Sequence, residues 1–179
     1  MRNLLCKYIR MCAQGSNADV YDFPPLFTLQ PNLNSRKKQF GLWVGILQTK
    51  AAAQYLFFET SEIFHNARLG RRMEPALFLA FGDHLVSEKL GEWKSKGSML
   101  LFYHKPLSDW ATIVHDWATK WGKLNGVESL LSLRAEPEFR EVPPELLLRA
   151  VETLEKMGKC EVFFQEVRTV ETCGVKFFP

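Results

Sequence analysis

The 179-residue sequence predicts an α+β fold in which two similar small domains follow one another, each with three helices and then a β-hairpin. Two observations support this prediction. A pattern of large apolar residues returns after about 70 residues, and each copy closes with two short apolar runs separated by a turn. The composition, 46% apolar and 24% charged, is typical of a globular protein with a packed core. We assign residues 34–104 to the first domain and 105–179 to the second.

The first domain opens with a predicted helix that is capped by Asn34 or Ser35 and runs to about Tyr55. Its apolar residues recur at the spacing i, i+3, i+4, i+7, at Phe40, Trp43, Val44 and Leu47. A short extended piece at residues 56–58 and a small helix at residues 66–72 are expected to follow.

Proline at the first helical turn predicts that the next helix begins at Glu74-Pro75, and it ends by Gly91. Its buried stripe is expected at Leu77, Phe78, Phe81, Leu85 and Val86. The apolar run at residues 99–103 pairs with the residues around Trp93 across a turn at 94–98, which completes a hairpin.

The second domain repeats this order. Ser108 is expected to cap a helix whose stripe has the same four-position spacing as the first stripe, at Trp110, Ile113, Val114 and Trp117. The helix that opens at Pro144 repeats the Pro75 helix at nearly the same offset and ends at Gly158. A second hairpin is predicted from residues 160–165 and 174–178. Three helices followed by a hairpin is the pattern of a winged helix, so the sequence predicts two tandem winged-helix domains with wings at 94–98 and 166–172.

A winged helix often binds DNA, which requires a basic third helix. The helices at 74–90 and 144–159 are close to neutral and strongly apolar, which favours packing against protein. Nucleic-acid binding, as in a transcription-related protein, is accordingly the alternative function and not the main one. The basic cluster of Arg68, Arg71 and Arg72 is interpreted either as a solvated face or as a contact for an acidic partner or anionic lipid.

Residues 19–33 form a predicted docking segment around the stretch Phe23, Pro24, Pro25, Leu26 and Phe27. The two prolines restrict the backbone dihedral φ and remove two backbone donors, so we expect a polyproline-like, extended conformation. The apolar side chains of this segment must then be buried in pockets, either of this chain or of a partner. The segment is either a strap on the core of its own chain or a stiffened anchor for another protein, and these two interpretations are evenly matched.

Residues 1–18 contain Arg2, Lys7 and Arg10 without an acidic residue, so the rest of the chain carries 20 basic and 20 acidic side chains. The part expected to fold therefore has no net attraction for phosphate. We interpret residues 1–18 as a disordered extension. Its apolar residues also have helical spacing, which leaves a membrane-surface helix or a mitochondrial presequence open.

The sequence predicts no enzyme activity, no cofactor and no metal site. It has no phosphate-binding loop and no nucleophile motif, and its four histidines and four cysteines lack zinc-ligand spacing. Cys160 and Cys173 are expected to be buried, reduced thiols. Among the tryptophans, Trp43, Trp110 and Trp117 are predicted to be core, whereas Trp121 is predicted to be exposed and a candidate interface residue.

Several motifs resemble one family closely. The stretch from Phe23 to Asn32, the basic helix start from Arg36 to Gln39 and the C-terminal stretch from Gly174 to Phe178 are similar to the vacuolar protein-sorting-associated protein 25 family. Members of that family are the smallest subunits of the endosomal sorting complex ESCRT-II. The resemblance covers about residues 20–178.

This resemblance implies tandem winged helices and a cytoplasmic adaptor that is recruited to the endosomal membrane. It implies that the segment of Phe23, Pro24, Pro25, Leu26 and Phe27 docks on two larger ESCRT-II subunits. It also implies that the second winged helix recruits an ESCRT-III subunit, in the sorting of ubiquitinated cargo to multivesicular bodies. Membrane contact is expected to be indirect or weak.

Overall fold

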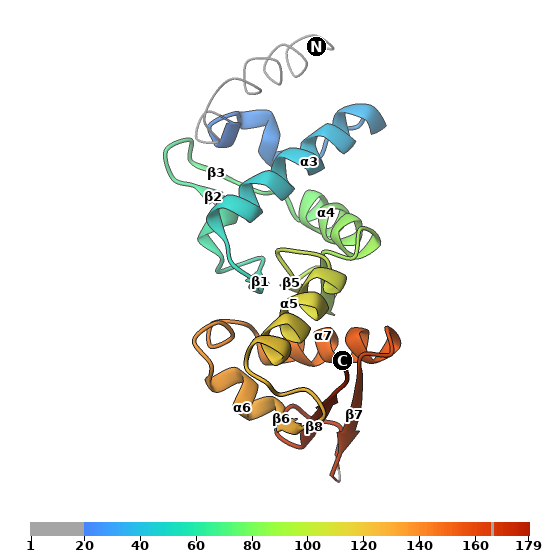
Figure 1. Cartoon of the computed structure of the whole chain (residues 1–179). Helices are drawn as coiled ribbons and strands as arrows, with labels where there is room; N and C mark the ends of the chain where they lie inside the picture. Colours follow the sequence, from blue (N-terminus) through green and yellow to red (C-terminus); the bar gives the residue numbers. More distant parts are fainter. Residues whose placement is uncertain (1–19, 166) are drawn as a thin grey trace. The chain divides into compact units, whose positions relative to one another are not determined.

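The computed structural model describes residues 20–165 and 167–179 (Figure 1). The described residues divide into two compact units, 20–104 and 105–179. In each unit helices pack on a three-stranded antiparallel sheet, so the chain has the α+β fold that the sequence predicts.

In the described part of the first unit, a 3₁₀ turn, η1 (Pro24–Phe27), precedes a long helix, α3 (Leu33–Lys50). Strand β1 (Gln54–Phe57) follows, and then the 3₁₀ turn η2 (Glu62–Phe64) and two very short strands, β2 (His65–Asn66) and β3 (Arg71–Arg72). Helix α4 (Pro75–Ser87) leads into the hairpin of β4 (Gly91–Ser95) and β5 (Met99–Phe102). The sheet order is β1-β5-β4.

Helix α3 is shorter than predicted at its C-terminal end and starts earlier. Its cap is Asn32, whose side-chain oxygen accepts hydrogen bonds from the backbone of Asn34 and Ser35, so those two residues are not the cap. The helix ends at Lys50 because residues 54–57 pair with β5, where Leu56 lies opposite Leu100 in the sheet. Pairing with β5 buries Leu56, which a longer helix would not achieve.

The helix predicted at residues 66–72 does not exist. These residues form the β2–β3 hairpin instead, with His65 opposite Arg72. Gly70 adopts φ +57°, and the side chain of Asn66 accepts a hydrogen bond from the backbone nitrogen of Leu69. A left-handed glycine and an asparagine-closed turn favour a reversal of the chain over a helix.

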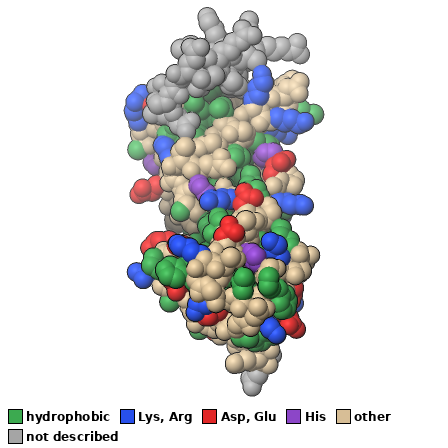
Figure 2. Space-filling model, viewed as in Figure 1, with side chains coloured by type: hydrophobic (Ala, Val, Ile, Leu, Met, Phe, Trp, Pro, Cys, Tyr) green, Lys and Arg blue, Asp and Glu red, His purple; other side chains and the backbone are tan. Residues whose placement is uncertain are grey.

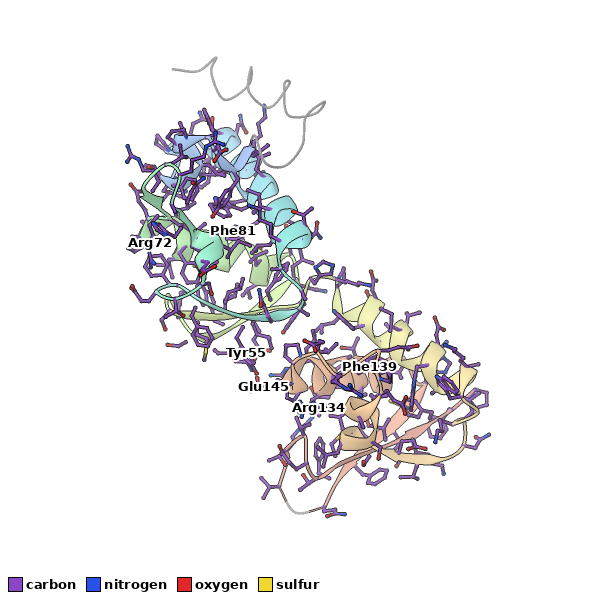
Figure 3. All side chains as sticks on the ribbon, turned by 90° about the vertical axis from the view of Figure 1, so that its left-hand side faces the viewer. Tyr55, Arg72, Phe81, Arg134, Phe139 and Glu145 are labelled. Atoms are coloured by element: carbon purple, nitrogen blue, oxygen red, sulfur yellow. The ribbon has the colours of Figure 1, made fainter. Side chains whose placement is uncertain are left out.

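Helix α4 begins at Pro75 as predicted and places Leu77, Phe78, Phe81 and Leu85 in the core. It stops at Ser87, before Gly91, because Lys89 takes a left-handed conformation and Gly91 already belongs to β4. Of the predicted stripe, Val86 is 40% exposed. The side chain of Phe81 lies among the packed elements of this unit (Figure 3), 6.3 Å from the ring centre of Trp43.

The second unit contains helices α5 (Leu107–Lys120), α6 (Leu130–Ala135) and α7 (Pro144–Lys156). Its sheet joins β6 (Val127–Ser129), β8 (Cys173–Phe177) and β7 (Cys160–Phe164) in that order. Helix α7 ends where Gly158 adopts φ +73°, as the sequence predicts. Phe139 is completely buried inside this unit (Figure 3).

Two details of the second unit differ from prediction. Helix α5 has Pro106 rather than Ser108 at its N-cap, and the Ser108 hydroxyl instead donates to the Asp109 carboxylate. Strand β6 and helix α6 were not located by the sequence pattern, although a third helix was expected in each domain. In the first unit η2, β2 and β3 stand where this helix stands in the second.

The sequence repeat extends to the topology of the sheets. In both units the strand after the first helix pairs with the last strand of the hairpin, Gln54 opposite Phe102 and Val127 opposite Lys176. The end positions of the two stripes are buried in both units. These are Phe40 and Leu47 in the first unit and the equivalent Trp110 and Trp117 in the second. The two units therefore have the same winged-helix order of helix, strand, helical or looped crossover, helix and hairpin.

Candidate docking site

The predicted docking segment is a turn, not an extended strand. Residues Pro24–Phe27 form η1, in which the backbone nitrogen of Leu26 donates to the carbonyl oxygen of Phe23 at 2.9 Å. The prediction of a polyproline-like conformation is therefore wrong. The φ that proline imposes suits the start of a 3₁₀ turn as well as polyproline, and the burial of the residues that follow favours the turn.

Leu26 and Phe27 lie in the core of the first unit, each with 1% of its surface exposed. The Phe27 ring meets Trp43 edge-on, with the ring centres 5.5 Å apart and the planes at 89°. The backbone oxygen of Phe27 also accepts from the nitrogen of Glu74, at the entry to α4. For these two residues the strap interpretation is therefore correct, since they pack on the core of their own chain.

The other three residues of the segment remain at the surface. Pro24 is exposed, whereas Phe23 and Pro25 are partly exposed, and Phe23 also packs against the core cluster of the first unit. We call these three residues the proline ridge. The structure therefore divides the predicted site into an internal part, Leu26 and Phe27, and an external part, the proline ridge.

Further contacts fix the ends of the segment. The Tyr21 hydroxyl lies 2.9 Å from the carbonyl oxygen of Ile63 and 3.0 Å from that of His65. Asn66 donates to the backbone oxygen of Tyr21 and to the Asp22 carboxylate. Burial, with a smaller effect of the neighbouring Asp22 charge, raises the pKa of Tyr21 above 10.0, so this phenol stays protonated and able to donate.

The sequence prediction missed Gln39, which is buried in α3 and bonds the backbone of the segment. A signal for it exists in the sequence. Gln39 precedes Trp43 by one helical turn and so lies on the helix face that carries the apolar stripe. A polar residue on an apolar face needs a buried partner, and here the partner is the segment itself.

The basic cluster is mostly engaged within the first unit. Arg68 forms an ion pair of 2.9 Å with Asp22, and Arg72 donates to the backbone oxygen of Glu59 at 2.7 Å. These contacts support the interpretation of a solvated face. On the side shown in Figure 2, basic and acidic side chains are interspersed over the described surface.

Neither third helix offers a basic face to nucleic acid. In α4, Asp83 accepts a hydrogen bond from the indole nitrogen of Trp93 and pairs with Lys96 of the wing. In α7, Glu152 is buried and pairs with Arg149 and with Arg168 of the second wing. Acidic side chains therefore tie each wing to its helix, at positions where a DNA reader needs cations.

His84, His115, Cys160 and Cys173 occupy structural positions. His115 lies 2.9 Å from the backbone oxygen of Phe178, and His84 stacks on Phe40. Cys160 and Cys173 are buried free thiols, as predicted, and burial raises their pKa to about 12 and about 11. Over residues 20–165 and 167–179, no group of three or more metal-ligating side chains comes together. In the same ranges no helix is both long and apolar enough to cross a bilayer.

The second unit exposes several large apolar side chains. Trp121 is 56% exposed, as predicted, whereas Trp110 and Trp117 are buried. Side chains more than two-fifths exposed also include Val127, Leu131, Met157, Phe163 and Val167. Phe163 lies across Gly174 of the neighbouring strand, on the outer face of the sheet that also carries Val127.

A model of a family of ESCRT-II complex subunits matches residues 20–145. Among curated proteins the chain is similar to vacuolar protein-sorting-associated protein 25 of Dictyostelium discoideum, with 27% identity over 89% of this chain and 97% of the relative. It is also similar to the Homo sapiens protein of that name, with 29% identity over 88% of this chain and 94% of the relative. The resemblance read from the motifs is confirmed.

Solved structures agree on the fold. The chain is similar to a crystal structure of subunit VPS25 of the endosomal trafficking complex ESCRT-II, with a TM-score of 0.75 and 24% identity over 88% of this chain and 96% of that one. A second match is to the crystal structure of ESCRT-II assembled from VPS22, VPS25 and VPS36, with a TM-score of 0.72, 21% identity and coverage of 88% and 97%.

Proposed function

Because the chain belongs to the family of ESCRT-II complex subunits, we propose that it is a non-enzymatic adaptor that docks on two larger ESCRT-II subunits through the proline ridge. The observation that carries this proposal is the division of the segment. Leu26 and Phe27 are buried in the chain's own core, which leaves Phe23, Pro24 and Pro25 at the surface on a fixed turn.

The physical chemistry of the ridge suits docking. Proline has few conformations to lose, and a turn that is already formed lowers the ordering cost of binding. An apolar side chain that becomes fully buried contributes roughly 1.5 to 3 kcal/mol, and Phe23, which is already partly buried, can gain part of that on docking. The assembly of a similar protein with two other subunits, VPS22 and VPS36, supports two larger partners for this chain.

The second winged helix is proposed to recruit an ESCRT-III subunit. The exposed apolar side chains of that unit, Trp121, Val127, Leu131 and Phe163 among them, give it a surface suited to protein contact. The adaptor would then work from the cytoplasm at endosomes, in the sorting of ubiquitinated cargo to multivesicular bodies, with a membrane contact that is indirect or weak.

Co-expression with the two larger ESCRT-II subunits tests the docking proposal. The triple variant Phe23→Ala, Pro24→Ala, Pro25→Ala is expected to lose co-elution in gel filtration while it stays folded. The matched control is Phe57→Ala with Val86→Ala, which removes side chains 44% and 40% exposed elsewhere on the first unit and should co-elute as wild type does. Co-elution of the triple variant would refute the proposal.

Recruitment by the second unit has a separate test. Immobilised wild-type chain should retain purified ESCRT-III subunits, and single substitutions of Trp121, Val127, Leu131 and Phe163 by aspartate should identify the face that binds. Retention that survives all four substitutions would contradict a role for these side chains.

A further inference from the structure

The side chain of Gln39 is a buried polar group whose hydrogen bonds all go to the backbone of the docking segment. It is 1% exposed, and its amide nitrogen lies 3.2 Å from the carbonyl oxygen of Pro25, 3.0 Å from that of Leu26 and 2.7 Å from that of Thr28. Its amide oxygen accepts from the backbone nitrogen of Gln30 at 3.3 Å. Within the described residues every hydrogen bond of this side chain joins α3 to the backbone of the docking segment.

This arrangement requires an amide. Three carbonyl oxygens converge on one –NH₂ group, and only a donor satisfies them. An ionised glutamate would place a fourth acceptor among them, and methionine would remove the donor that they share, leaving only the Gln30 amide for Pro25 and Thr28 and the Trp43 indole for Leu26. The neighbouring Trp43, one helical turn further along α3, adds a donor of its own, since its indole nitrogen lies 3.0 Å from the oxygen of Leu26.

The carbonyl groups that Gln39 holds belong to the turn that carries the proline ridge. Pro24 and Pro25 have no N–H, so hydrogen bonds to these two residues can reach the backbone only through its carbonyl oxygens, beside the turn bond from Leu26 to Phe23. The orientation of the two proline rings follows directly from that backbone. Gln39, whose amide bonds all three of these oxygens, therefore joins the ridge backbone to α3 from the core side without reaching the surface itself.

We propose that Gln39 is a positioning residue that holds the proline ridge in the conformation a partner recognises. This inference rests on the proposed docking function. It means that Gln39 affects the affinity for the partner although it is buried and does not touch the partner. Preorganisation of this kind strengthens binding because it reduces the conformational entropy that the segment loses when the complex forms.

The test compares full-length variants by their affinity for the purified complex of the two larger ESCRT-II subunits, measured by isothermal titration. Gln39→Met keeps the length of the side chain and removes the amide. We expect its affinity to fall at least tenfold. The control is a core variant with a similar loss of thermal stability in the same unit, such as Leu85→Ala in α4, which should keep its affinity within about twofold when measured below its unfolding temperature.

A second variant separates positioning from general destabilisation. Gln39→Glu should bind poorly at pH 7.5, where a carboxylate faces the three oxygens, and recover part of its affinity at pH 5.5 as the buried carboxyl takes up a proton and becomes a donor. The wild-type chain, measured in parallel, supplies the reference for any other pH effect.

The outcomes distinguish the two proposals. If the triple ridge variant Phe23→Ala, Pro24→Ala, Pro25→Ala binds as tightly as wild type, the docking function fails and this inference fails with it. If the triple variant loses affinity but Gln39→Met does not, or if Leu85→Ala loses as much as Gln39→Met, docking stands and the positioning role is overturned.

Discussion

The ring of Phe27 stands edge-on against the indole of Trp43, with ring centres 5.5 Å apart, and both side chains are almost completely buried. A residue of the docking segment is thereby part of the same cluster as the first helix of the first winged helix. Stability and the proposed docking function therefore depend on neighbouring residues of one five-residue stretch, so each substitution there is expected to act mainly on one of the two.

The coupling predicts different stabilities for two neighbouring substitutions. Phe27→Ala should destabilise the first unit by about 3 to 5 kcal/mol, because it leaves a cavity beside Trp43. Pro24→Ala should change stability by no more than about 1 kcal/mol, since its side chain is exposed. Chemical unfolding followed by tryptophan fluorescence measures both. Equal effects would mean that Phe27 is not packed as described.

Two helical glycines are predicted to respond to alanine with opposite signs. A Cβ on Gly82 of α4 would lie 2.1 Å from the Trp93 indole, so Gly82→Ala must displace that ring and its hydrogen bond to Asp83. A Cβ on Gly45 of α3 meets nothing within 4 Å, so Gly45→Ala should stabilise the protein by roughly 0.5 to 1 kcal/mol. Thermal unfolding of the two variants gives the comparison, and a stabilised Gly82→Ala would count against the packing of Trp93.

The second wing is predicted to depend on one ion pair. Arg168 contacts the buried carboxylate of Glu152 at 2.7 Å and lies over the ring of Phe164. Arg168→Ala should cost about 1 to 3 kcal/mol of unfolding free energy, because a buried carboxylate loses one of its two cations. Lys120→Ala, which breaks an exposed pair of 3.5 Å with Glu138, is the control and should change stability by less than about 1 kcal/mol. Similar losses of unfolding free energy in Arg168→Ala and Lys120→Ala would show that the Glu152 carboxylate is not desolvated.

The buried thiols predict a loss of stability at alkaline pH. Burial raises the pKa of Cys160 to about 12 and of Cys173 to about 11, whereas an unfolded thiol titrates near 8.5. The folded state therefore binds more protons than the unfolded state, so stability that is complete below about pH 8.5 declines as pH rises toward 11. Urea unfolding at several pH values should show a shallower decline in the variant Cys160→Ala, Cys173→Ala than in wild type. Identical slopes would contradict the burial of the thiols.

The sequence was sufficient to predict the elements whose apolar residues repeat at helical spacing. The stripes that include Trp43 and Trp117 form buried helix faces, and Pro75 and Pro144 open the third helices. The exposure of Trp121 was also predictable, because it lies beyond the stripe of α5. The apolar spacing and the prolines act within a single helix, and the tertiary packing favours the same local structure.

Elements that depend on a distant partner were not predictable. Strand β6 is very short, has no apolar alternation and exists because it pairs with β8, which lies at the far end of the second unit's sequence. The sequence predicts polyproline at η1 because proline's φ is compatible with both conformations. Only the pocket beside Trp43, which receives Leu26 and Phe27, distinguishes them.

The central claim is that the proline ridge touches a larger ESCRT-II subunit while Leu26 and Phe27 stay in the chain's own core. Site-specific incorporation of the photo-cross-linker benzoylphenylalanine in place of Phe23, in the reconstituted complex, tests it most directly. The same probe in place of Phe57, 44% exposed on β1, serves as the control. We predict a cross-link from position 23 to a larger subunit and none from position 57. A complex that forms normally but yields no cross-link from position 23 would contradict the claim.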